Sequence, residues 1–176
     1  FAEAATGEAR KALVRQAARE FQILEGIDHP GILKVRDYKE SEQGPALIFD
    51  HDAKSQRLDF LLREQGSRLS ADQRLHLLRN LAETLKYAHQ KKLYHRALCP
   101  QSILVRDPES ALPALKIMNW QTASRDSGTG STSMRTVGTL HIEDYVEDPG
   151  RVYLAPESNW GEAGNGPHSD VFSLGA

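Results

Sequence analysis

The sequence predicts an α+β fold, because apolar residues recur with both helical and strand periods along one chain. Two stretches have the helical period, residues 8–26 and 71–91. Short apolar or alternating runs predict strands at residues 32–35, 46–49, 103–106 and 114–118.

The elements follow in order. The first predicted helix ends at Gly26, a residue type that commonly terminates helices. A polar hairpin with Gly44-Pro45 joins the first two strands, and a short helix is expected over residues 58–64. The run at 124–139 is rich in Ser, Thr and Gly, so we expect a mobile segment there.

The long helix over residues 71–91 has Ser70 as its expected N-cap. Its apolar residues predict one buried face and therefore a core helix; they are Leu75, Leu78, Leu81, Ala82, Leu85 and Ala88.

The most informative stretch is residues 94–105, which reads Y-H-R-A-L-C-P-Q-S-I-L-V. Five further landmarks flank it in a fixed order, and six ordered landmarks are hard to obtain by accident. The five are residues 19–33, 46–50 (A-L-I-F-D), 115–121 (L-K-I-M-N-W-Q), 153–157 (Y-L-A-P-E) and 169–175 (S-D-V-F-S-L-G).

In this order the landmarks resemble the protein kinase family, serine/threonine type. The resemblance implies a bilobal protein-kinase-like fold, present here as a fragment from helix C to the start of helix F. Residues 1–52 correspond to a partial N-lobe with helix C, strands 4 and 5 and the hinge. Residues 53–176 correspond to a partial C-lobe with helices D and E, the catalytic loop, an activation segment over 119–157 and the start of helix F. The glycine-rich loop and the strand 3 lysine are expected outside the chain.

The polar groups of kinase chemistry are replaced at four positions. The family pattern is H-R-D, four residues and an Asn, followed later by D-F-G. Ala97 stands at the Asp and cannot accept a proton, and Cys99 stands where a lysine is common and brings no charge. Ser102 replaces the metal-binding Asn with a shorter ligand, and Asn119 replaces the D-F-G Asp without its negative charge.

These replacements indicate a pseudokinase that acts as a regulatory or scaffolding module without ordinary phosphoryl transfer. One alternative is an active serine/threonine kinase that uses non-standard metal ligands, such as Asn119 and Ser102. Another is a structural remnant that binds no nucleotide.

The resemblance also places a candidate nucleotide pocket. Phe49 takes the gatekeeper position, Asp50 the first hinge position and Leu104 the pocket floor, with Met118 and Asn119 nearby. We expect no tightly held cofactor: ATP binding is weak or absent, and magnesium binding is impaired. The histidines show no metal-ligand spacing with cysteine or acidic residues, so no metal site is expected.

This sequence has compatible residues at the positions where kinases stack apolar side chains in their core. By position, Leu24, Val35, Trp120, His95 and Asp170 take the places of the stack that runs from helix C to helix F. Trp120 is larger than the Phe of D-F-G, which favours a locked stack.

Four further structural positions come from the resemblance. Glu20 either pairs with the strand 3 lysine or is a solvated helix acid. Arg96 either binds a phosphate on the activation segment, with Thr136 or Thr139 as the modified residue, or pairs with a local carboxylate. Pro156 and Glu157 keep the A-P-E anchor, whereas Gly150 replaces a threonine of the substrate region; its position is three residues before Tyr153.

Composition and net charge limit which binding partners and which cellular compartment we expect. The net charge of −2 gives no case for nucleic acid or an anionic membrane, and no apolar run approaches a membrane span. The single cysteine excludes an internal disulfide and favours a reducing cytoplasm. In style the chain resembles the large multidomain bacterial kinases of phage-exclusion systems. The expected partner is a protein or an adjacent domain of the same polypeptide, and the oligomeric state stays open.

Overall fold

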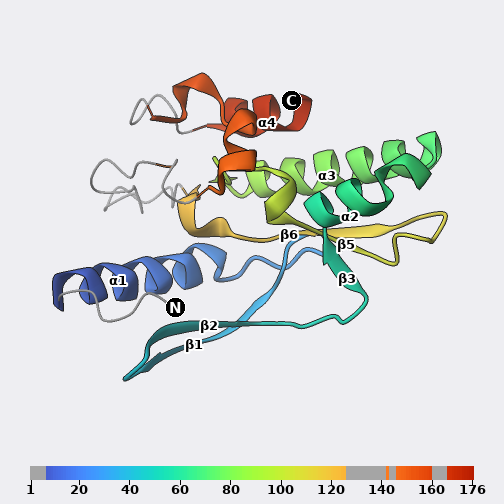
Figure 1. Cartoon of the computed structure of the whole chain (residues 1–176). Helices are drawn as coiled ribbons and strands as arrows, with labels where there is room; N and C mark the ends of the chain where they lie inside the picture. The colour runs from blue at the N-terminus through green and yellow to red at the C-terminus, as the bar shows by residue number, and fades with distance from the viewer. Residues whose placement is uncertain (1–6, 126–141, 143–145, 160–165) are drawn as a thin grey trace.

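The computed structural model describes residues 7–125, 142, 146–159 and 166–176. Helix α1 and the hairpin β1–β2 lie on one side of the molecule, and helices α2, α3 and α4 lie on the other (Figure 1). Strands β5 and β6 lie between these two groups. Most of the expected mobile run at 124–139 falls outside the described residues.

The first part consists of α1 (Gly7–Leu24), β1 (Val35–Ser41) and β2 (Gly44–Phe49). The two strands form an antiparallel hairpin in which Tyr38 pairs with Leu47. The strand expected at 32–35 is wrong in its bounds, because β1 begins at Val35 and Ile32 makes only an isolated bridge to Ile117.

A three-stranded antiparallel sheet joins the two sides of the molecule. Its order is β3 (Ser55–Arg57), β5 (Ile103–Arg106) and β6 (Ala114–Ile117). Helix α2 (Leu58–Gln65) follows β3, close to its predicted range, and a 3-10 turn (Gly66–Arg68) leads to the long helix.

The long helix α3 (Ala71–Gln90) begins as predicted at Ser70. The Ser70 hydroxyl accepts a hydrogen bond from Gln73 N (3.2 Å), and Gln73 Oε1 accepts one from Ser70 N (2.9 Å), which together form a capping box.

The predicted apolar face of α3 is only partly correct. The buried residues are Leu77, Leu81, Thr84, Leu85 and Ala88, whereas Leu75 and Leu78 are 57% and 51% exposed. Periodicity shows that a face exists, but the neighbouring elements decide which part of it is covered.

One main core connects the elements on both sides of residue 52. Ile23, Leu24 and Ile27 of the first part share it with Leu85 and Ile117. A close approach of backbone to α3 supports this junction, because a Cβ at Gly31 would overlap the side chain of Thr84. The lobe boundary at residue 52 stays a prediction.

The remaining elements are short and surround the loops of interest. They are β4 (Leu93–Tyr94), η2 (Pro100–Ser102), η3 (Trp120–Thr122), β7 (Ser124–Arg125), η5 (Asp148–Tyr153), η6 (Pro156–Asn159) and α4 (Pro167–Gly175). Strand β4 pairs antiparallel with β7. Over the ranges that the structure describes, the helices are too short or too polar to serve as membrane spans.

The α3 cap gives a direct stability prediction. Replacing Ser70 by Ala removes one partner of the capping box and leaves Gln73 N without its acceptor, so we expect the free energy of unfolding to fall by about 1 kcal/mol. Urea denaturation followed by circular dichroism measures it. Ser67→Ala, at an exposed position four residues before the helix, is the control; equal loss in both variants would contradict the cap.

Candidate functional site

The loop after β4 is held by a buried carboxylate of α4. Asp170 is fully buried, and its Oδ2 accepts a hydrogen bond from His95 N (2.9 Å) while its Oδ1 accepts one from Arg96 N (2.7 Å). His89 of α3 contacts the same carboxylate through Nε2 at 2.8 Å. A buried carboxylate is tolerated only when it is paired in this way.

His95 is fully buried within this loop. Its Nε2 donates to Met118 O (2.9 Å), and its Nδ1 accepts from Ala97 N (3.3 Å). Burial lowers the pKa of the ring. The two partners and the low pKa describe a neutral imidazole with a structural role.

Trp120 packs on this ring. The two rings meet edge to face with centroids 4.7 Å apart, and Trp120 is 1% exposed. Leu24 and Trp120 belong to the same core, and Val35 packs against it. Of the five residues assigned to the stack, His95 contacts Trp120 through its ring and Asp170 through its backbone N–H, and Leu24 and Val35 lie in or against the same core as Trp120.

Helix α1 contacts the segment after β6 through two polar residues. Glu20 is 7% exposed, and its Oε1 accepts from Trp120 N at 3.0 Å. Burial raises the pKa of Glu20 to about 7, against a smaller lowering by that hydrogen bond. The preceding Arg19 donates to Ala123 O (2.6 Å). The burial of Glu20 contradicts its interpretation as a solvated helix acid, and pairing with the strand 3 lysine stays a prediction.

The Ser102 side chain makes two hydrogen bonds within its own loop. Its Oγ donates to Cys99 O (2.8 Å) and accepts from Cys99 N (3.0 Å), and the residue is 1% exposed. The hydroxyl is thereby committed to its own loop. A neutral hydroxyl that already makes two hydrogen bonds is a weaker magnesium ligand than the amide oxygen of the family's Asn.

Asn119 is placed differently. It is exposed and has left-handed backbone angles (φ +62°, ψ +54°), which asparagine tolerates better than most residues. A small pocket of about 40 Å³ is lined by Asn119 together with Ala97, Cys99 and Ser102. The structure thus brings the four replaced positions to one place, with one exposed amide and no carboxylate among those four.

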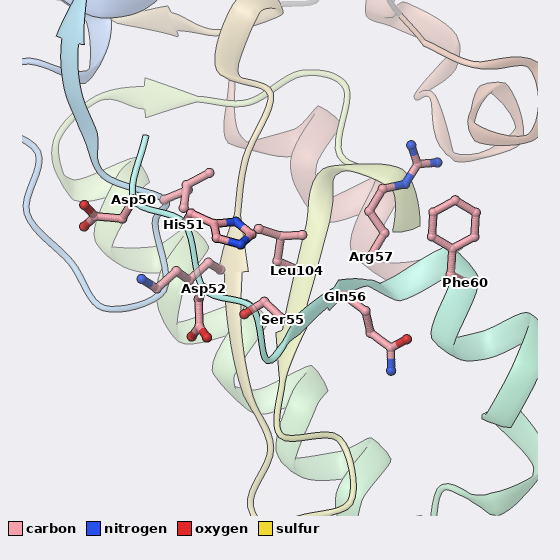
Figure 2. A pocket seen from close by; sticks show the side chains of 10 residues that line it. Asp50, His51, Asp52, Ser55, Gln56, Arg57, Phe60 and Leu104 are labelled. Carbon is pink, nitrogen blue, oxygen red and sulfur yellow. The ribbon is translucent and has the colours of Figure 1, made fainter. Parts of the chain in front are cut away.

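A larger pocket of about 370 Å³ lies beside the hinge (Figure 2). Residues 50–52, which the resemblance assigns to the hinge, lie on one side of it, Arg57 and Phe60 on the other, and Leu104 of β5 between them. Of the five residues proposed for nucleotide binding, Asp50 and Leu104 line this pocket. Phe49 packs on the main core, Met118 is absent from both pocket linings described, and Asn119 lines the smaller pocket.

The charges of the hinge pocket are mostly paired. Asp50 and Arg36 form a two-pronged ion pair (2.6 and 2.8 Å), which holds the pKa of that carboxyl below its usual range. Arg57 pairs with Asp59 (2.7 Å) and with Glu147 (3.0 Å).

Two of the assigned structural residues lie in η6. Pro156 begins this turn, and Glu157 Oε1 lies 3.8 Å from His168 Nε2. The Arg96 guanidinium donates to Thr122 O at 3.4 Å, and burial followed by the charge of Arg19 lowers its pKa. Thr136 and Thr139 lie outside the described residues, so phosphate binding stays a prediction.

Several site residues were missed by sequence reasoning. The sequence analysis gave His89 and Arg19 no role of their own, and the Arg57–Glu147 ion pair joins residues 90 positions apart. Only spacing could have signalled His89, six residues before His95. No group of three or more His, Cys, Asp or Glu residues able to hold a metal ion occurs in the part of the chain that the structure describes.

Removal of the Asp170 charge is expected to destabilise the chain. Asp170→Asn keeps one acceptor oxygen but loses the carboxylate that serves three partners, so we expect a loss of about 2–4 kcal/mol in the free energy of unfolding. Urea denaturation measures the loss. The exposed Asp148→Asn is the control, with an expected change below about 0.5 kcal/mol; similar values for the two variants would contradict the anchor.

Glu20 is expected to make stability depend on pH. Its pKa rises from 4.5 in the unfolded chain to about 7 in the fold, so the folded state holds the proton more tightly. Stability is therefore lost as pH rises from about 4.5 to about 7, by roughly 3 kcal/mol in total, and changes little above that range.

The measurement compares wild type with Glu20→Gln from pH 4 to pH 8. Glutamine keeps an acceptor for Trp120 N and cannot ionise. The free energy of unfolding of Glu20→Gln, relative to that of the wild type, should therefore increase as pH rises. Parallel pH profiles would show that Glu20 does not titrate in this way.

Comparisons with known proteins agree with the geometry. The protein kinase domain family matches residues 3–176. Probable kinase PglW of Streptomyces coelicolor is 34% identical over 166 residues, which cover 84% of this chain and 11% of that protein. The chain thus spans about a tenth of the length of this curated relative.

A solved structure has the same fold. The crystal structure of the yeast RNA Pol II CTD kinase CTDK-1 complex superposes with a TM-score of 0.66 and 23% identity, over 92% of this chain and 47% of that one. The expected kinase-like α+β fold is confirmed. The chain belongs to the protein kinase domain family.

Proposed function

We propose that this chain is a pseudokinase domain, which serves as a regulatory or scaffolding module and does not transfer phosphate. Family membership supplies the fold, but function depends on the site. The observation that carries the proposal is Ser102, whose buried hydroxyl makes both of its hydrogen bonds to Cys99 main chain. The side chain at this metal-binding position of the family is therefore engaged elsewhere.

The other replaced positions support the same conclusion. Ala97 has no group that can orient or deprotonate a hydroxyl, and such help is typically worth about 10²–10⁴ in rate. Asn119 offers a neutral amide where magnesium prefers a carboxylate. The residues present do not fit two bound magnesium ions, and no step of a reaction is assigned to them.

The hinge pocket supports weak nucleotide binding rather than none. It combines an apolar floor at Leu104 with polar edges, and its volume of about 370 Å³ lies in the range of small-ligand sites. Because the phosphate and metal positions are altered, we propose weak ATP binding through the base and ribose, without a requirement for magnesium.

The partner and the setting are part of this proposal. A kinase fold that does not transfer phosphate can still bind other proteins through its surface. We therefore propose that its partner is another protein or an adjacent domain of the same polypeptide. Similarity to a much longer bacterial protein supports the multidomain setting. A cytoplasmic location and a place in a phage-exclusion system stay predictions.

An autophosphorylation assay tests the loss of activity. Pure protein with labelled ATP and magnesium should show no transfer above a heat-inactivated sample. The positive control is an active serine/threonine kinase under identical conditions. Transfer that disappears in Asn119→Ala would establish the alternative, an active kinase with non-standard metal ligands.

A further inference from the structure

Most of the charged side chains that line the hinge pocket are already bound to a group of opposite charge. Asp50 forms its ion pair with Arg36 (2.6 and 2.8 Å), and Asp52 forms one with Arg106 (3.1 Å). Arg57 is held by two carboxylates of its own. Both carboxylates of the lining are therefore neutralised by arginines that approach from outside the pocket lining.

Lys116 is the exception among these charged side chains. It is half-buried in β6, pairs with Leu104 across the sheet and lines the pocket. Over the ranges that the structure describes, its ammonium makes no ion pair and no hydrogen bond. The pKa of the Asp50 carboxyl is lowered first by Arg36 and further by the charge of Lys116, which places the ammonium at the same end of the pocket as Asp50. A half-buried ammonium of this kind is stabilised by any acceptor that a ligand brings.

The ring of His51 is the second ionisable group that is open to a ligand. Figure 2 shows this ring pointing toward Leu104, the apolar residue between the two sides of the pocket. Among the described residues, neither ring nitrogen makes a hydrogen bond. A neutral imidazole always carries one N–H donor. The ionisable groups left open in this pocket can therefore donate hydrogen bonds, whereas its carboxylates are occupied.

Open donors favour a base whose edge carries acceptors. A purine with an oxo group at position 6, such as guanine or hypoxanthine, presents O6 and N7 side by side, and lysine commonly binds these two atoms when proteins recognise guanine. Adenine carries an amino group in place of O6, so its N–H donors would face an ammonium. Such an opposed pair of donors weakens the complex with the wrong base and so creates specificity.

We propose that the hinge pocket prefers a 6-oxopurine nucleotide, of inosine or guanosine, to an adenine nucleotide, and that Lys116 determines this specificity. The inference rests on the nucleotide binding proposed above and changes the base that is bound. The apolar floor at Leu104 serves either purine, so the polar edge of the base decides between them. The pocket volume of about 370 Å³ is at the lower end of the range for small-ligand sites and suits one base with its ribose.

ITP and ATP are the matched probes, because they share the ribose and the triphosphate and differ at position 6 and the adjoining N1. Calorimetric titration of the wild-type chain without magnesium should give a dissociation constant for ITP that is on the order of tenfold lower than that for ATP, as expected for one base contact. GTP should bind as ITP does, since it has the same O6 and N7.

Three variants show whether Lys116 causes the preference. Lys116→Met keeps an unbranched side chain without the ammonium, so the affinities for ITP and ATP should become equal. Lys116→Glu should reverse the preference, because a carboxylate accepts from the adenine amino group. Lys54→Met is the matched control: it removes the same charge near the hinge, but the Lys54 side chain is 68% exposed and is not part of the pocket lining. The control should keep the wild-type preference for ITP.

Tripolyphosphate, which is the anion without a base, separates base recognition from phosphate binding. It should compete equally well with ITP in the wild type and in Lys116→Met. Weaker competition in Lys116→Met would show that Lys116 binds phosphate and would overturn the proposal.

Two further results would overturn the proposal while weak nucleotide binding stands: a wild-type chain that binds ATP as tightly as ITP, or a preference for ITP that persists in Lys116→Met. Absence of binding by all three nucleotides would refute the specificity together with the nucleotide binding proposed above. Phosphate transfer in the autophosphorylation assay would refute the pseudokinase function alone, so the two proposals can fail separately.

Discussion

The carboxylate of Asp170 is the constraint on which the site depends. It accepts hydrogen bonds from two successive backbone N–H groups, at His95 and Arg96, and contacts His89. Arg96 has a left-handed backbone (φ +71°), which is unfavourable for a residue with a Cβ. The buried carboxylate offsets that cost, because it can be satisfied only if both N–H groups point toward it. The turn that follows places His95 under Trp120 and directs residues 97–102 toward the cleft.

From Asp170, apolar and main-chain contacts connect this loop to the segment after β6 and to α1. His95 packs on Trp120, and Trp120 N donates to Glu20 of α1. Helix α4, the loop, the segment after β6 and α1 are thus connected without a metal, a nucleotide or any of the four replaced residues. This separation means that the family's fold does not depend on the four positions that we propose have lost their chemistry. The same positions then become available for packing, as Ala97 and Cys99 show.

The order of motifs was sufficient to predict the family and the α+β class, because these depend on residue identity and spacing. The direction of a side chain was not predictable. Nothing in the sequence indicated that the Ser102 hydroxyl would bond to Cys99, or that Glu20 would meet Trp120 N. Leu75 and Leu78 have the right period for the core but are exposed, because the surrounding elements cover other parts of α3. Ala97 packs in one apolar cluster with Val146, about 50 positions away, which local patterns do not report.

The central claim is that the kinase frame is kept while its metal positions are lost. Calorimetric titration with ATP, with and without magnesium, tests it most directly, because ordinary kinases bind ATP together with the ion. We predict weak binding with the same affinity in both titrations. An affinity that rises tenfold or more when magnesium is added would contradict the claim, since it would show that Asn119 and its neighbours still hold the ion.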